Sequence, residues 1–166
     1  MFDQIKELKN KTIICEKLNV CMYNKDYVLE FHWNLPISQE TINFPKILEV
    51  MPSDYKYFLT YVANGATLYH EVDFGQWGYW LYSIEEIIIK QEFWKKYLLP
   101  EEGIYLPFGE MYGENSVLAF DLNSPKVRIV EATSYDKPED WYQVAKSFEE
   151  MTRLLIQNNG EKFWEE

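Results

Sequence analysis

Hydrophobic positions in the middle of the chain alternate with a period of two. In residues 117–122, the odd-numbered side chains point to one side of a strand and the even-numbered ones to the other. Gly109 and Gly113 interrupt the apolar pattern before this segment, and an Asn-Ser-Pro turn at 123–125 follows it. Together with the alternating residues 126–132, this pattern predicts an antiparallel meander. We expect helical segments before and after it.

The N-terminal part predicts a helix and a hairpin. Apolar side chains recur every three positions in the first ten residues, which predicts a short helix that ends near Asn10. Two apolar runs, 12–22 and 27–33, flank a polar turn at 23–26 and predict two paired strands. Ser38 can then begin a helix through Ile42, Ile47 and Leu48, which Pro45 should kink or split.

Residues 51–65 carry the strongest helical pattern in the chain. Five residues form one apolar stripe at helical spacing: Met51, Tyr55, Phe58, Leu59 and Val62. Pro52 suits the first helical turn, where its missing N–H costs nothing. Asn64-Gly65 should end the helix, because glycine adopts the left-handed conformation freely.

Two further helices are predicted in the second half. Ser83 and Glu86 form a capping-box pattern, which predicts a helix that carries Ile84, Ile87, Ile88 and Trp94 and follows a strand in 79–82. Pro138 is expected to open the last helix. Its apolar face would comprise Trp141, Val144, Ala145, Phe148, Met151 and Leu155, with Ser147 in mid-helix, Asn159-Gly160 at its end and a frayed tail over 160–166.

Composition narrows the class of partner. The chain has 166 residues, a net charge of −11 and 17% aromatic residues, which fits one folded domain over 1–166 and argues against disorder. An acidic surface repels phosphate backbones and disfavours direct nucleic-acid binding, whereas it attracts a basic protein.

No apolar run is long enough for a membrane span, and the N-terminus does not resemble a signal peptide. Cys15 and Cys21 are expected to be reduced thiols, so we expect a cytoplasmic protein.

Candidate sites for chemistry are few. His70, Glu71 and Asp73 could supply metal ligands, but a structural zinc site needs four, and a half-buried histidine beside two surface acids is the better interpretation. Glu110 and Glu114 flank the central turn and could act as an acid/base pair in a small hydrolase. Since no nucleophile elbow, phosphate loop or Cys–His pattern accompanies them, we expect no enzyme, no metal and no cofactor.

Acidic and aromatic residues provide candidates for partner binding. Trp77 and Trp80 belong to an aromatic segment in which alternation places them on opposite faces, and exposed tryptophans commonly anchor interfaces. Acids near the central hairpin and on the 71–73 segment would pair with lysine or arginine of a partner. The predicted partner-binding residues are Glu71, Asp73, Trp77, Trp80, Glu110, Glu114 and Asp121.

Four stretches, in this order, resemble the SUKH superfamily, the family of the yeast cell-wall-assembly regulator and its bacterial relatives. They are MPSDYKYFL through Asn64-Gly65, LYSIEEI at 81–87, LPFGE through LAFDL at 106–122, and VAKSFEE at 144–150. The similarity extends from near Ser38 to Leu155, so residues 1–35 fall outside it. The motif positions with structural roles are Pro52, Tyr55, Phe58, Leu59, Asn64, Gly65, Ser83, Gly109, Ser147 and Phe148.

The resemblance implies an α+β fold, in which helices pack against a twisted, mainly antiparallel sheet. It also implies a non-enzymatic, protein-binding role. Many bacterial members resemble immunity proteins that bind and block a toxin domain, often a basic nuclease, and this is our first hypothesis. The alternative is a regulatory or scaffold module with an endogenous client protein.

Overall fold

The computed structural model describes all residues except 1, 23, 39–46, 74, 102–103 and 166. Its eight strands are β1 (Lys17–Met22), β2 (Lys25–Trp33), β3 (Ala66–Glu71), β4 (Tyr79–Leu81), β5 (Tyr105–Met111), β6 (Ser116–Asp121), β7 (Arg128–Thr133) and β8 (Tyr142–Ala145). The helices are α1 (Asp3–Thr12), α2 (Ile47–Val50), α3 (Ser53–Tyr57), the π-helix η2 (Phe58–Val62), α4 (Ile84–Tyr97), the 3₁₀-helix η3 (Pro138–Asp140) and α5 (Phe148–Gln157).

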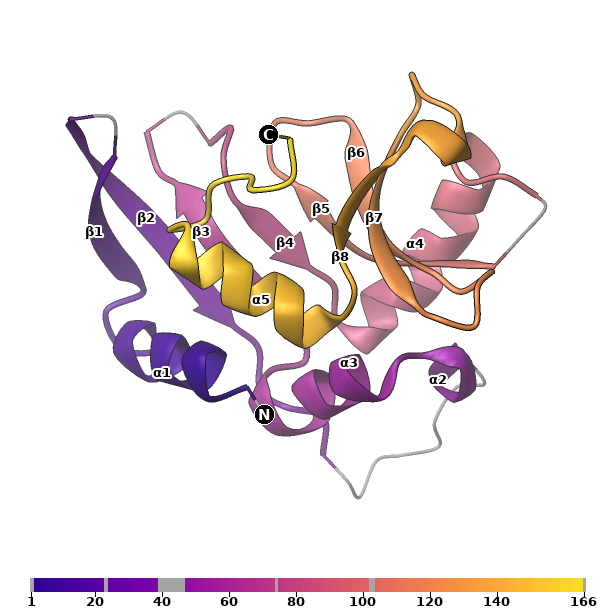
Figure 1. Cartoon of the computed structure of the whole chain (residues 1–166). Helices are drawn as coiled ribbons and strands as arrows, with labels where there is room; N and C mark the ends of the chain where they lie inside the picture. Colours follow the sequence, from indigo (N-terminus) through magenta and orange to yellow (C-terminus); the bar gives the residue numbers. More distant parts are fainter. Residues whose placement is uncertain (1, 23, 39–46, 74, 102–103, 166) are drawn as a thin grey trace.

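All eight strands form one antiparallel sheet (Figure 1). They lie side by side in chain order, β1 to β8, so each strand pairs only with its neighbours in the sequence. This arrangement confirms the expected α+β fold with a mainly antiparallel sheet. The predicted central hairpin is β5–β6, and β7 completes the expected meander.

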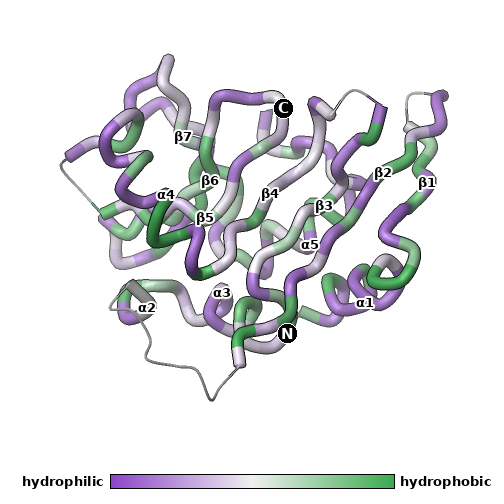
Figure 2. Tube along the Cα trace, turned by 180° about the vertical axis from the view of Figure 1, so that it is seen from behind, coloured by the Kyte–Doolittle hydropathy of each residue, from purple (hydrophilic) through white to green (hydrophobic). Residues whose placement is uncertain are grey.

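Helices cover the two faces of the sheet unequally. The helices α1, α3 and α5 lie on one face (Figure 1), where Ile5, Tyr55 and Phe148 join the main core. On the other face α4 lies over the β5–β7 region, and Figure 2 shows β1–β4 without a helix above them. There Trp94 packs with Val117, one of the outward side chains of the alternating strand β6. Every residue of β6 is consequently buried.

The predicted helix at 51–65 forms as two joined turns, α3 and η2. All five residues of its predicted apolar stripe are buried. The Tyr55 hydroxyl donates to the carbonyls of Tyr82 and Phe108 at 3.1 and 3.4 Å, which ties α3 to the residue after β4 and to the middle of β5. Gly65 ends the segment with φ +87°, and a Cβ there would lie 2.6 Å from the Ser83 nitrogen. Only glycine therefore fits this position.

The capping box at the start of α4 is confirmed. The Ser83 side chain accepts from the Glu86 amide, and the Glu86 carboxylate accepts from the Ser83 amide at 2.7 Å. All four apolar residues predicted for this helix lie in α4. Ile84, Ile87 and Trp94 face the core and are buried, whereas Ile88 is 41% exposed.

The N-terminal prediction needs one correction. The first helix continues to Thr12 and the strand begins only at Lys17, so the strand predicted from Thr12 is too long. The Thr12 hydroxyl donates to the Leu8 carbonyl at 2.8 Å and so belongs to the last turn of α1. The helix predicted from Ser38 to Leu48 falls mainly outside the described residues, which include only α2 at its end.

The predicted last helix from Pro138 is wrong. Residues 138–140 form η3, residues 142–145 form the edge strand β8, and α5 starts only at Phe148. Ser147 is the N-cap of α5, not a mid-helix residue, because its hydroxyl accepts from the Glu150 amide at 3.1 Å. The frayed end is also wrong for the described tail residues, since Trp164 is buried and bonded to Glu131 at 2.6 Å.

Candidate functional site

The strand order gathers the hairpin connections at one end of the sheet. Because consecutive strands run in opposite directions, the β1–β2, β3–β4, β5–β6 and β7–β8 connections all lie at the same end. The C-terminal segment lies there too, as the upper rim of Figure 1 shows. We call the described residues of these connections, with residues 158–165 and the adjoining Lys25 and Asp26, the hairpin edge.

The hairpin edge carries an excess of exposed acids. They are Asp26, Asp73, Glu114, Asp136, Glu139, Asp140 and Glu165. The lysines among its described residues are Lys25, Lys137 and Lys162, and Lys162 is already bound by three carboxylates. The excess of acids gives this edge a negative potential that attracts cationic groups.

The β7–β8 connection adds an exposed aromatic side chain. Tyr135 is 84% exposed, next to Asp136, whose carboxylate accepts from the Thr133 hydroxyl at 2.7 Å. The buried Trp141 holds the other end of the loop, since its indole N–H donates to the Thr133 carbonyl at 3.3 Å and its ring packs edge-on against Tyr105. The loop is thus anchored at its base and presents Tyr135 to solvent.

The C-terminal segment is fixed to the sheet by its backbone and its side chains. The Gly160 carbonyl accepts from the Trp77 indole and the Tyr79 hydroxyl, both at 3.0 Å. Lys162 donates to Glu131 at 3.0 Å and to Glu114 at 2.5 Å, linking the tail to β7 and to the β5–β6 turn. These contacts make the tail part of the hairpin edge.

The environment of Lys162 favours its charged form. Burial acts to lower the pKa of Lys162, but its hydrogen bonds to Glu114, Glu165 and Glu131 outweigh burial and raise that pKa above the usual range. The ammonium group is consequently a permanent cation at neutral pH. It neutralises part of the negative charge of Glu114, Glu131 and Glu165. The acids of the hairpin edge that do not contact Lys162 remain as its negatively charged surface.

Three predicted partner-binding residues lie on the hairpin edge. Asp73 is exposed, Glu114 is bound to Lys162, and Trp77 is half-buried between the tail and Tyr27, whose ring is 5.9 Å away. Glu71 differs from the expectation of a surface acid because it is buried. Its carboxylate accepts from the amides of Asp73 and Gly75 at 2.9 and 3.2 Å, so it shapes the β3–β4 connection.

Trp80 and Glu110 belong to a different surface, on the face that carries α4. Glu110 accepts hydrogen bonds from Lys90, at 2.5 Å, and from the Tyr82 hydroxyl. The Lys90 ammonium also lies 4.8 Å from the centre of the Trp80 ring, within range of a cation–π interaction. Burial and the neighbouring Glu110 carboxylate raise the pKa of Tyr82, which therefore stays a hydrogen-bond donor. This cluster links α4 to β4 and β5.

Asp121 lies at the opposite end of the sheet and is buried, so it does not belong to an acidic binding surface. Its carboxylate accepts from Arg128 Nε at 2.7 Å and from the Asn123 amide at 3.0 Å. Burial acts to raise the pKa of Asp121, but these hydrogen bonds outweigh it and lower that pKa. The structure therefore separates the seven predicted residues into distinct places.

No arrangement for acid/base catalysis forms from the predicted carboxylates. Glu110 binds Lys90 of α4, whereas Glu114 binds Lys162 of the C-terminal segment, on the other face of the sheet. His70 packs against Tyr112, with ring centres 4.4 Å apart. Within the described ranges, no group of three histidine, cysteine, aspartate or glutamate residues could hold a metal ion.

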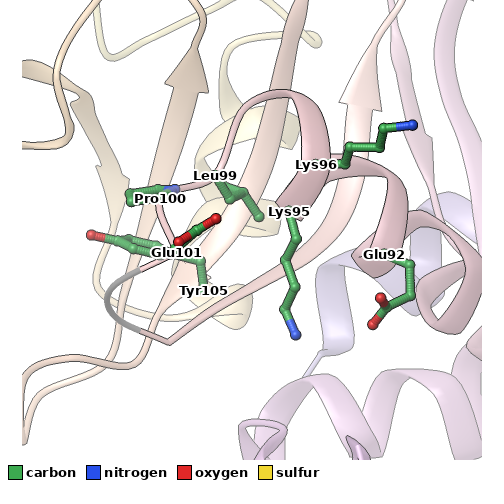
Figure 3. A pocket seen from close by; sticks show the side chains of 7 residues that line it. All are labelled: Glu92, Lys95, Lys96, Leu99, Pro100, Glu101 and Tyr105. Carbon is green, nitrogen blue, oxygen red and sulfur yellow. The ribbon is translucent and has the colours of Figure 1, made fainter.

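A shallow pocket of about 430 Å³ lies at the C-terminal end of α4 (Figure 3). Its lining comprises Glu92, Lys95, Lys96, Leu99, Pro100, Glu101 and Tyr105. Figure 3 shows the Lys95 and Lys96 side chains extending away from one another. The charged groups do not converge on one point, so the pocket lacks the arrangement of a small-molecule site.

Sequence reasoning missed the exposed residues of the β7–β8 loop, namely Tyr135, Asp136, Glu139 and Asp140. The sequence pattern places them in a polar loop and at the start of a helix that does not form. One signal could have located them. Ser147 and Glu150 have the same Ser-x-x-Glu spacing as the recognised cap at Ser83, which places the helix start at 148 and frees the preceding residues for a strand and a loop.

Comparison with known proteins identifies the family. In the part of the chain that the structure describes, no helix has the length and apolar character needed to traverse a membrane. The searches of curated proteins and of solved structures gave no significant match. The sequence profile of one family matches residues 36–153, from the segment before α2 into α5, and leaves out α1, β1, β2 and the C-terminal tail. The chain belongs to the SMI1 / KNR4 family (SUKH-1), as its sequence motifs predicted.

Proposed function

We propose that this chain is an immunity protein that binds a basic bacterial toxin domain and covers its active site. The toxin domain that we expect first is a nuclease. Membership of the SUKH-1 family supports a protein-interaction domain in general, in a family that is generally non-enzymatic. The identity of the partner as a toxin and the inhibition of that toxin are our proposal. The hairpin edge is the proposed contact surface.

The excess of acid at the hairpin edge is the observation that carries this proposal. A nuclease must hold phosphate groups, so its substrate-binding surface is basic. An acidic edge that also exposes Tyr135 is complementary to such a surface in charge and offers an aromatic anchor. The β7–β8 loop would supply the anchor, and Asp73, Glu139 and Asp140 would pair with lysine or arginine side chains of the toxin.

Capture followed by an inhibition assay tests the proposal. The tagged chain is purified from its own host at low and at high salt, and any partner that co-elutes is identified. The partner's basic domain is then produced alone and its cleavage of DNA and RNA is measured with rising amounts of the chain. We expect capture that weakens at high salt, and loss of cleavage near a 1:1 ratio.

Two results would contradict the proposal. A captured nuclease domain that binds the chain but keeps its full cleavage rate would exclude blockage of the active site. Capture of a signalling or wall-synthesis protein in stoichiometric amount would favour a regulatory or scaffold role with an endogenous client.

A further inference from the structure

The outer side of α4 carries an apolar stripe that the fold does not use. Ile89, Phe93 and Tyr97 follow one another at intervals of four and are 70%, 46% and 58% exposed. The inner side of the same helix already buries Ile87 and Trp94. Residues spaced by four lie on one side of a helix, so the three exposed side chains form a continuous strip. Contiguous exposed apolar surface on a folded domain marks an interaction site.

The stripe is accessible along the helix. Figure 2 shows α4 as the outermost element on its face of the sheet, with no other described segment in front of it. The rings of Phe93 and Tyr97 pack against each other at 4.7 Å, and the Lys96 ammonium lies 4.9 Å from the centre of the Tyr97 ring. The stripe is therefore pre-ordered by its own contacts and loses little side-chain freedom on binding.

The two ends of α4 carry charges of opposite sign. Glu85 and Glu86 lie in its first turn, and Lys95 and Lys96 in its last. A basic partner such as the proposed toxin domain would meet the lysines at one end, which disfavours it as the occupant of this stripe. An antiparallel copy of the same helix instead places acids against lysines at both ends.

The apolar and charged residues of two α4 helices face suitable partners when the helices lie antiparallel about a two-fold axis at residue 91. Positions whose numbers add to 182 then face each other, so Ile89 meets Phe93 of the other copy. Lys96 lies beside position 86 of the other copy, within one residue of the exposed Glu85. Glu85 can contribute because its contact to Asn64, at 3.1 Å, is exposed to solvent. A parallel pairing would instead bring like charges together.

We propose that α4 is the interface of a homodimer, in which the stripes of two copies pack antiparallel and Glu85 of each copy pairs with Lys96 of the other. The helix has 14 residues and is ~21 Å long, so the contact is small and the dimer is weak. The net charge of −11 on each copy adds long-range repulsion. We expect a dissociation constant on the order of 10–100 µM at physiological salt.

Analytical ultracentrifugation of the full chain tests the dimer. The average mass should rise from 20.0 kDa toward twice that value between about 1 µM and 1 mM protein. Glu85→Lys alone and Lys96→Glu alone should each weaken the dimer about tenfold or more. Combining both changes in one chain should restore it, and mixing the two single variants should produce a heterodimer that forms more readily than either homodimer.

Matched control variants distinguish a contact through this stripe from a general effect of net charge. Lys95→Glu changes the net charge as Lys96→Glu does but lies about 100° away around the helix, so it should leave the dimer within about threefold of the wild type. Ile89→Lys, in the stripe and two residues from the proposed two-fold axis, should abolish the dimer. The proposal would be overturned if the chain stayed monomeric up to about 1 mM, the highest useful concentration. It would also be overturned if the dimer had the same dissociation constant after each of the two charge reversals. These outcomes are independent of toxin binding, which is assigned to the hairpin edge.

Discussion

At the scale of single residues, buried carboxylates contribute to stability through specific donors. Asp121 is ionised and receives hydrogen bonds from Arg128 and Asn123 in the folded chain. Because its pKa is lower in the folded than in the unfolded state, this contribution is complete above the unfolded pKa of about 3.9 and disappears as the pH falls through the folded value. Protonation of Asp121 at acid pH should therefore lower the free energy of unfolding.

Replacing Asp121 by Asn should lower the free energy of unfolding by about 1–2 kcal/mol at pH 7, and the difference from the wild type should shrink below about pH 4. Urea unfolding at several pH values measures both quantities. Asp26→Asn, a change at an exposed aspartate, serves as the control and should stay within about 0.5 kcal/mol of the wild type. A difference for Asp121→Asn that does not depend on pH would show that shape, rather than charge, matters at this position.

Gly160 controls the attachment of the C-terminal segment. It has φ +84°, and a Cβ would lie 2.4 Å from the Tyr69 ring. Gly160→Ala should thus cost about 3 kcal/mol of unfolding free energy, since backbone strain adds to a steric clash. Gly75→Ala is the matched control, because Gly75 has φ +65° but its nearest neighbour is 3.7 Å away, so only the strain of about 1 kcal/mol is expected. Equal costs for the two variants would exclude the clash.

At the scale of elements, Asp54 joins two helices that are distant in the sequence. One of its carboxylate oxygens accepts from the amides of Phe148 and Glu149, at 2.7 and 3.2 Å, at the start of α5. Asp54→Ala should lower the free energy of unfolding by about 2 kcal/mol, because two amides at a helix N-terminus lose a charged acceptor. Urea unfolding measures the change.

Two further variants serve as comparisons for Asp54→Ala. Ser147→Ala removes one capping bond of the same helix and should cost about 1 kcal/mol. Ser53→Ala, next to Asp54 on the exposed side, should change stability by less than about 0.5 kcal/mol. An Asp54→Ala effect no larger than that of Ser53→Ala would refute the link between α3 and α5.

Elements with a strong local signal were predictable from the sequence. The alternation of 117–122, the stripe from Met51 to Val62 and the box at Ser83 each depend on neighbouring residues, and each is confirmed. The structure of segment 138–147 was not predicted correctly, because Trp141, Val144 and Ala145 fit helical spacing. In the fold, pairing with β7 makes residues 142–145 a strand. Strand pairing is a long-range interaction, and local spacing does not report it.

The candidate site was predictable in kind but not in position. Net charge indicated an acidic surface, yet sequence neighbours such as Glu71 and Asp73 differ completely in exposure. Glu110 and Glu114 are only four apart, but a turn sends them to lysines on opposite faces of the sheet. Which acids remain available to a partner depends on these tertiary ion pairs, and those follow from the fold rather than from spacing.

At the scale of the whole molecule, the placement of charge predicts how the proposed partner binds. Reversing one charge on the hairpin edge, as in Glu139→Lys, should slow association with the basic partner about two- to fivefold at low salt and reduce the salt dependence of the rate, with little change in stability. Glu49→Lys makes the same change in net charge on α2, at the opposite end of the sheet. Stopped-flow measurement of the association rate compares the two. If the proposed edge is correct, Glu139→Lys has the larger effect, since steering depends on charges near the contact. Equal slowing by both variants would mean that only net charge matters and would remove the hairpin edge as the binding surface.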